Sequence, residues 1–129
     1  MKTLKEHINE ALKIGKNLSE WSAYSCQPKT KEELKEIIEK RISKEGPNCD
    51  LNDIDTSQIT DMEGIFCESE FNGDISEWDI SNVTNVKGMF AKTYFNQDIS
   101  NWKINKDCTV NSMFRDCHIK EEYKPVLPE

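Results

Sequence analysis

The chain of 129 residues lacks the features that identify an enzyme or a membrane protein. No apolar run approaches the roughly 20 residues that span a bilayer, and the opening MKTLKEHINEAL mixes charges into its apolar positions, unlike a secretory signal. The five glycines form no phosphate-binding loop, and neither an HExxH motif nor a Ser/His/Asp arrangement is visible. We therefore expect a cytoplasmic protein outside the membrane, with no catalytic activity and no cofactor.

The five cysteines are an odd number and include no CxxC pair. In a chain without an export signal they are expected to be reduced thiols that act as small core residues. Cys117 and His118 are neighbours, but nothing nearby has metal-ligand spacing, and we predict no metal site. The cysteines are Cys26, Cys49, Cys67, Cys108 and Cys117.

Basic residues are scarce in one part of the chain, which gives the net charge of −7 an uneven distribution. Residues 1–46 carry ten basic and eight acidic residues, whereas residues 47–70 carry seven acids and no base. Such a surface repels nucleic-acid phosphate and attracts basic partners, with an effect that salt screens. The sequence therefore predicts a basic protein partner and no direct binding to nucleic acid.

The dominant feature is an internal repeat over residues 47–118. Three copies of 24 residues, PNCDLNDIDTSQITDMEGIFCESE, FNGDISEWDISNVTNVKGMFAKTY and FNQDISNWKINKDCTVNSMFRDCH, align without a gap. Apolar and polar positions fall in register in all three copies. Examples are Phe66, Phe90 and Phe114; Asp50, Asp74 and Asp98; Asn48, Asn72 and Asn96; and Ile54, Trp78 and Trp102.

Each copy has two halves with different periods. In the first half of copy two, Trp78 and Ile80 alternate with polar residues, as a short strand with one buried face does. In the second half, apolar residues from Val83 to Phe90 recur at three- and four-residue steps, which is typical of a helical stripe. Copy three departs at Asp107, where the others have an apolar residue. We predict an α/β repeat, a short leucine-rich-repeat-like solenoid of three 24-residue strand–helix units.

Repeated aspartates raise the alternative of a calcium site. An EF-hand loop needs acids at alternate positions, and the series Asp50, Asn52, Ile54 fails at its third ligand. We therefore interpret the Asn and Asp columns as structural, binding backbone N–H groups at a turn. Trp78 and Trp102 share the register of Ile54, which favours core packing over a ligand-stacking surface.

Residues 1–46 are predicted to form an α-helical N-terminal cap region. Thr30 and Glu33 make a capping box, Leu34, Ile37, Ile38 and Ile42 form an apolar stripe, and Gly46 with Pro47 ends this helix. An earlier helix is expected after Thr3, while the sequence leaves residues 16–28 open between a short helix and a packed loop. Residues 119–129 are predicted to fold over the last copy as an irregular capping tail.

The segments FNGDISEWDISNVTNVKGMF and FNQDISNW resemble the short tandem repeats of the BspA-like, DUF285 type. The resemblance covers about residues 47–118. It implies a leucine-rich-repeat-like solenoid and, as in bacterial surface proteins, adhesion or protein recognition. Short members without an export signal are similar to those carried in bacteriophage genomes. The resemblance supplies no catalytic residues.

Side chains that alternate with the buried ones are predicted to share one face of the stacked units, about 5 Å apart from unit to unit. We expect this mostly acidic face to bind a protein partner, although its residues would also serve solubility alone. One form of this function is a phage or mobile-element inhibitor of a basic host nucleic-acid enzyme. The alternative is a surface-recognition protein of the adhesin type, and a monomer or weak homo-oligomer is expected. The predicted face comprises Asn52, Asp53, Asp55, Ser76, Glu77, Asp79, Ser100, Asn101 and Lys103.

Overall fold

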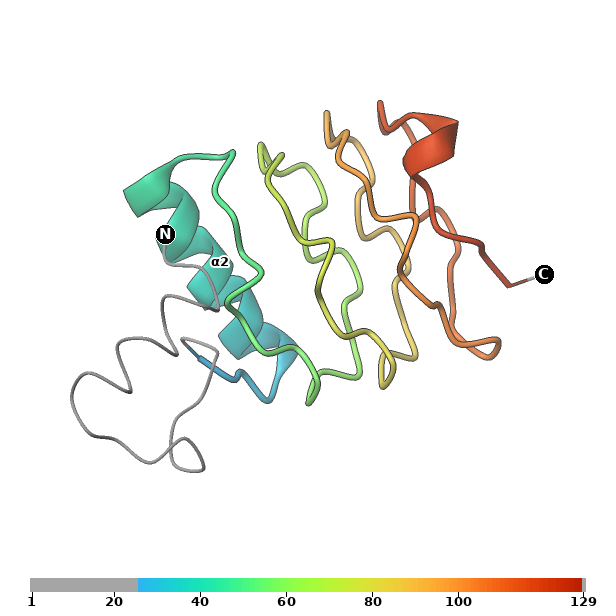
Figure 1. Cartoon of the computed structure of the whole chain (residues 1–129), viewed down its shortest axis with the longest axis horizontal. Coiled ribbons are helices and arrows are strands. Elements are labelled where there is room, and N and C mark those ends of the chain that lie inside the picture. The colour runs from blue at the N-terminus through green and yellow to red at the C-terminus, as the bar shows by residue number, and fades with distance from the viewer. Residues whose placement is uncertain (1–25, 129) are drawn as a thin grey trace.

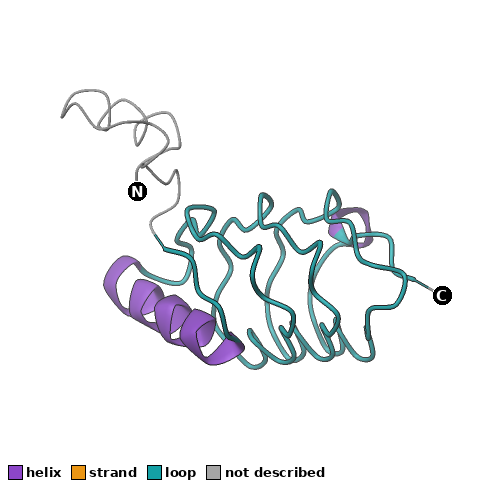
Figure 2. Cartoon of the chain, turned by 90° about the horizontal axis from the view of Figure 1, so that it is seen from below, coloured by secondary structure: helices purple, strands orange, loops and turns teal. Residues whose placement is uncertain are grey.

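The computed structural model describes residues 26–128 and shows three stacked rungs of chain with a helix against one end (Figure 1). The helix α2 spans Lys31–Glu45, and a short 3-10 helix, η1, spans Glu121–Tyr123. The three repeat copies form the rungs: rung 1 is residues 47–70, rung 2 is 71–94 and rung 3 is 95–118. Seen from below, α2 lies across the open side of rung 1 (Figure 2).

Helix α2 begins and ends where the sequence predicts. The Thr30 hydroxyl accepts a hydrogen bond from the Glu33 N–H at 3.1 Å, and the Glu33 carboxylate accepts one from the Lys29 N–H at 3.1 Å. At the other end Gly46 has φ 94° and its N–H donates to the Ile42 carbonyl at 2.8 Å. Leu34 is fully buried within the core that the rungs form. The predicted cap, apolar stripe and helix end are confirmed.

The predicted strand–helix solenoid, however, is wrong. Within the part of the chain that the structure describes, the rungs contain no strand and no helix (Figure 2). The only β-type pairings there are isolated parallel bridges, Cys26 with Ile54, Asp61 with Asn85, and Asn85 with Thr109. Each rung is instead built from consecutive turns.

The turns explain why a helix-like apolar spacing gives no helix. In rung 1 the N–H of Ile65 donates to the Met62 carbonyl at 3.2 Å, and the N–H of Cys67 to the Gly64 carbonyl at 3.0 Å. Gly64 has φ 61° and Glu68 has φ 58°, so left-handed residues recur every four positions and interrupt any right-handed helix. The equivalent residues of the other rungs share this conformation: Gly88, Lys92, Ser112 and Asp116.

Neighbouring rungs are joined by a row of backbone hydrogen bonds, which we call the inter-rung row. Every second N–H of the turn segment in one rung donates to a carbonyl of the next, beginning with Met62 to Asn85 at 2.8 Å and Gly64 to Lys87 at 2.9 Å. The row continues with Phe66 to Met89 and Glu68 to Ala91, both at 3.0 Å. From rung 2 to rung 3 the donors are Val86, Gly88, Phe90 and Lys92, and the acceptors are Thr109, Asn111, Met113 and Arg115.

The core consists of columns of equivalent side chains. The rings of Phe66, Phe90 and Phe114 stack with centroids 5.5 and 5.7 Å apart. Trp78 and Trp102 are buried and nearly parallel, with centroids 6.5 Å apart. Each indole N–H donates to a carbonyl of the preceding rung, Trp78 to Leu51 at 2.9 Å and Trp102 to Ile75 at 3.0 Å. The prediction that the tryptophans belong to the core is confirmed.

Rung 3 accommodates Asp107 by a local shift. Asp107 is exposed, and Cys108 is buried in its place. The Cys108 N–H donates to the Asn105 carbonyl at 3.0 Å, as the Val83 N–H does to the Ile80 carbonyl in rung 2. Burial raises the pKa of the Cys108 thiol above its ordinary value, consistent with a core residue. Among the cysteines, Cys49 is also buried, whereas Cys67 is exposed.

Residues 119–127 lie against rung 3. Ile119 is buried, the Ile99 N–H donates to the Tyr123 carbonyl at 3.0 Å, and the Lys120 N–H donates to the Asn96 side chain at 2.9 Å. The helix expected after Thr3 and residues 16–25 lie outside the described residues.

The left-handed conformation of Gly88 in rung 2 and of its equivalent Ser112 in rung 3 makes a prediction about stability. A Cβ at Gly88 would meet no atom within 4 Å, so Gly88→Ala tests the backbone alone at φ 60°. We expect it to lower the free energy of unfolding by about 1–2 kcal/mol, because an L-residue is strained there. In a helix the same change would stabilise by about 1 kcal/mol. Urea denaturation measures the difference. The companion Ser112→Gly, at φ 57°, is expected to be neutral or stabilising.

Candidate functional site

The structure divides the predicted face into two parts. Residues from rungs 2 and 3 line one shallow groove of about 210 Å³, whereas those of rung 1 do not reach it. The floor of the groove includes Trp78, Ile80 and Trp102. We call this the rung 2–3 groove. The predicted residues that line it are Ser76, Glu77, Asp79, Asn101 and Lys103.

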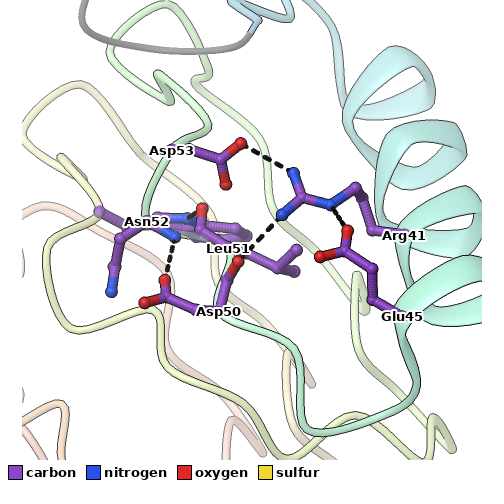
Figure 3. A network of polar contacts seen from close by, with 7 residues as sticks. Arg41, Glu45, Asp50, Leu51, Asn52 and Asp53 are labelled. Atoms are coloured by element: carbon purple, nitrogen blue, oxygen red, sulfur yellow. Dashed lines mark hydrogen bonds and ion pairs between the residues drawn. The ribbon is translucent and has the colours of Figure 1, made fainter. Parts of the chain in front are cut away.

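Asp53, in rung 1, forms an ion pair with α2. The Arg41 guanidinium contacts the Asp53 carboxylate at 2.9 Å, donates to the Asp50 carbonyl at 3.1 Å and pairs with Glu45 (Figure 3). The side chains of Arg41 and Asp53 are only 17% and 9% exposed. Burial lowers the pKa of Arg41, but the bonds to Glu45 and Asp53 outweigh it and the net pKa is raised. Asp53 therefore fastens α2 to rung 1.

The other predicted residues of rung 1 also make contacts within the fold. The Asp55 carboxylate accepts hydrogen bonds from the Gln27 side chain at 2.7 Å and from the Ser57 N–H at 2.9 Å. The Asn52 side chain accepts one from the Glu77 N–H at 2.9 Å, which joins rung 1 to rung 2. Asn52 thus joins two rungs, whereas Asp53 and Asp55 join rung 1 to α2 and to the segment before it. A role for these three residues in binding stays a prediction.

Glu77 and Asp79 are the exposed acids of the groove, with Lys103 as its one base. Hydrogen bonds from the Ser81 hydroxyl and the Ser81 N–H, the latter at 2.9 Å, hold the pKa of Asp79 below its ordinary value. No salt bridge involves Glu77, Asp79 or Lys103 within residues 26–128. These charges are therefore presented to solvent rather than neutralised by one another.

The Asp column, next to this groove, has a structural role. The carboxylates of Asp50, Asp74 and Asp98 each accept the N–H two residues along the chain, at 2.8, 2.9 and 2.9 Å. Such Asx-turns hold each rung in its bend. Burial opposes ionisation of Asp74, but hydrogen bonds from Ser76 outweigh it and lower its pKa. The interpretation of the column as structural is confirmed.

Sequence reasoning missed Arg41 and the boundary of the groove. Arg41 lies three and four residues from the apolar Ile38 and Ile37, so it borders the buried side of α2. That position in the sequence was the available signal for a basic residue facing rung 1. Its partner Asp53 is 12 residues away, and the pattern of the repeat alone does not identify it.

No helix within the described residues is both long and apolar enough to cross a membrane. No cluster of three or more His, Cys, Asp or Glu side chains in residues 26–128 is arranged to hold a metal ion.

The fold and the groove together define a repeat protein of stacked, turn-built rungs with a helix at one end. Residues 32–122 match the family described as "Mycoplasma protein of unknown function, DUF285". Because the match spans well over half of the chain, the protein belongs to the DUF285 family, and the BspA-like resemblance of its repeats is confirmed. No curated protein and no solved structure matches the chain.

The Arg41–Asp53 contact makes a stability prediction. Arg41→Met removes the guanidinium that contacts the Asp53 carboxylate, on a side chain only 9% exposed. We expect the free energy of unfolding to fall by on the order of 3 kcal/mol, with partial recovery in the double variant Arg41→Met/Asp53→Asn. The control is Lys40→Met, which removes the exposed Lys40–Glu36 pair of the same helix. It is expected to change the free energy of unfolding by less than about 0.5 kcal/mol. Equal losses for Arg41→Met and Lys40→Met would contradict a structural role for Asp53.

The lowered pKa of Asp74 predicts a pH dependence of stability. Its folded pKa lies below the ordinary 3.8, so the ionised form contributes stability above that pH. This contribution is lost as the pH falls through the folded pKa, because the unfolded chain takes up the proton first. At pH values below about 4 we expect the urea concentration at the unfolding midpoint to decrease as the pH falls. The decrease is expected to be less steep in Asp74→Asn. An identical pH profile in the variant would argue against the Asx-turn as the source.

Proposed function

We propose that this protein is a non-catalytic interaction module that binds a basic segment of a partner protein in the rung 2–3 groove. The observation that carries the proposal is the pair of exposed acids, Glu77 and Asp79, which form no salt bridge within the described residues. They lie over a floor of buried tryptophans in a shallow concavity.

The charge distribution supports a basic partner. The chain carries a net charge of −7, which steers positively charged surfaces toward it at low salt. Asp53 is already paired with Arg41, so the acids of rung 2 contribute more to this attraction than those of rung 1. Lys103 lies in the same groove and restricts the orientation of a bound partner. The partner must place a hydrogen-bond acceptor at Lys103 and its own basic side chains near Glu77 and Asp79.

A more specific form of the proposal is an inhibitor that occupies the basic groove of a nucleic-acid enzyme. Such a groove presents the Lys and Arg side chains that Glu77 and Asp79 would bind in place of phosphate. Competition with nucleic acid distinguishes this form from a general interaction module. A partner released from the module by DNA or RNA fits the inhibitor, and one unaffected by nucleic acid fits only the general role.

The test is affinity purification of the full chain from its native cell, followed by mass spectrometry of the co-eluting proteins. The identified partner is then titrated against the wild type and the double variant Glu77→Lys/Asp79→Lys by calorimetry. We expect the variant to bind at least tenfold more weakly at about 50 mM salt, and the difference to shrink as salt rises.

The matched control is Glu70→Lys/Glu122→Lys, which makes the same charge change at exposed sites outside the groove. Its affinity is expected to fall only slightly, through net charge alone. If both double variants lose the same affinity, net charge and not the groove attracts the partner. If neither loses affinity, the groove is not the binding surface.

A further inference from the structure

The last rung ends in a row of backbone N–H groups that no described residue accepts. The inter-rung row runs from rung 1 to rung 2 and from rung 2 to rung 3, and its next four N–H groups find no acceptor within residues 26–128. Carbonyls at this edge are engaged inside rung 3, since Met113 donates to Val110 at 3.1 Å and Arg115 to Ser112 at 3.2 Å. Cys117 likewise donates to the Phe114 carbonyl at 3.0 Å, so at these three residues the edge presents N–H groups without carbonyls. We call it the donor row: the N–H groups of Val110, Ser112, Phe114 and Asp116.

Apolar side chains at the same edge are also incompletely covered. Val86 and Phe90 of rung 2 are both 0% exposed, because rung 3 lies over them. Their equivalents Val110 and Phe114 are only partly buried. The tail reaches this edge through Lys124, whose amine lies 5.4 Å from the centre of the Phe114 ring. The turn segment of another rung would cover Val110 and Phe114 as that of rung 3 covers Val86 and Phe90, whereas the other half of the edge is occupied by the tail, through the bond from the Ile99 N–H to the Tyr123 carbonyl.

The opposite end of the stack presents the complementary groups. The carbonyls of rung 2 that accept the inter-rung bonds point toward rung 1. Their equivalents in rung 1 therefore point away from rung 2, toward the end of the stack where α2 lies (Figure 1). No N–H within the described residues donates to them. We call them the acceptor row: the carbonyls of Asp61, Glu63, Ile65 and Cys67.

Helix α2 shields the acceptor row, but none of its backbone N–H groups donates to these carbonyls. It lies across this end of the stack (Figure 2). Its Leu34 and Ile38 are buried, and Lys31 pairs with Asp61 at 3.6 Å. A cavity of about 420 Å³ remains between α2 and the rung, lined by Ile38 and Ile42 on one side and by residues 64, 65 and 67 on the other. Beyond its first turn the helix has its N–H groups engaged in its own hydrogen bonds, so it cannot replace a preceding rung.

We propose that the donor row is a docking surface for the acceptor row of a second copy of this chain, and that α2 blocks this head-to-tail stacking. An ordinary strand fits poorly, because its edge carries N–H groups as well as carbonyls, and these would face the donor row without acceptors. Two donor rows cannot pair for the same reason. The acceptor row of a like rung supplies four carbonyls at the spacing already used twice within the chain.

The proposed contact is heterologous, and its consequence depends on α2. One surface of each copy binds a different surface of the next, so copies that release α2 would add end to end into open oligomers. While α2 covers the acceptor row, the chain stays monomeric, and its donor row has no acceptor within residues 26–128. The proposal concerns other residues than the rung 2–3 groove, so neither result decides the other.

The test loosens α2 in the full chain. Ile38→Asp places a charge at a position 3% exposed between α2 and the rungs, and Ile38→Ala is the milder variant. Sedimentation velocity over a range of concentrations measures the mass, and tryptophan fluorescence reports whether Trp78 and Trp102 remain buried. We expect concentration-dependent oligomers of at least two copies, with buried tryptophans. Hydrogen exchange is expected to show new protection of the donor-row amides in these oligomers.

A second substitution tests which edge is used. Val110→Lys places a charge where the next copy would bury it, and is expected to restore the monomer in the Ile38 variants. Gln58→Lys adds the same charge at an exposed position in rung 1 and is expected to leave the oligomers intact. A folded, monomeric Ile38 variant overturns the proposal, as do oligomers that Val110→Lys does not dissociate.

If both Ile38 variants expose their tryptophans, Arg41→Met decides, because it removes the ion pair that fastens α2 to rung 1. Release of α2 then predicts concentration-dependent oligomers that Val110→Lys abolishes. A folded, monomeric Arg41→Met variant, or oligomers that persist in Val110→Lys, overturns the proposal.

Discussion

The inter-rung row of backbone hydrogen bonds is the constraint on which the rest of the structure depends. Every second N–H from Met62 to Glu68 must point at the next rung, while the residues between them close turns within their own rung. That geometry requires a left-handed residue every fourth position, which Gly64 and Glu68 supply. Because the row repeats every 24 residues, equivalent side chains are brought into columns, and the stacked phenylalanines and tryptophans follow.

Sequence patterns predicted the columns but not the backbone that makes them. The 24-residue register, the buried tryptophans, the Asp turns and the Thr30 cap are all visible as recurring residue types. Apolar spacing of three and four residues, however, suits both a helix and a series of turns. Gly64 and Gly88 recur within the apparent helical stripe, although glycine inside a helix destabilises it by about 1 kcal/mol. Their presence there indicated turns rather than a helix.

The candidate site shows a different limit of sequence reasoning. Alternation predicted which side chains leave the core, and Glu77, Asp79 and Lys103 do line a groove. It could not show that Asp53 lies under α2, because that depends on where Arg41 packs. The excess of acid in residues 47–70 is therefore partly internal, and the electrostatic character of the surface follows from tertiary pairing rather than from a count of charges.

The substitution at Asp107 in rung 3 shows that the spacing of the inter-rung row is kept more strictly than the apolar column. Asp107 breaks the apolar column, yet Cys108 fills the position one residue later, at no cost to the hydrogen bonds that follow. The Val86 N–H still donates to the Thr109 carbonyl at 2.8 Å, and the spacing of the row is unchanged. A column tolerates a shifted residue because apolar packing has no direction, whereas a backbone N–H displaced by one residue points the wrong way. The row therefore fixes the length of each copy, and the side chains adapt to it.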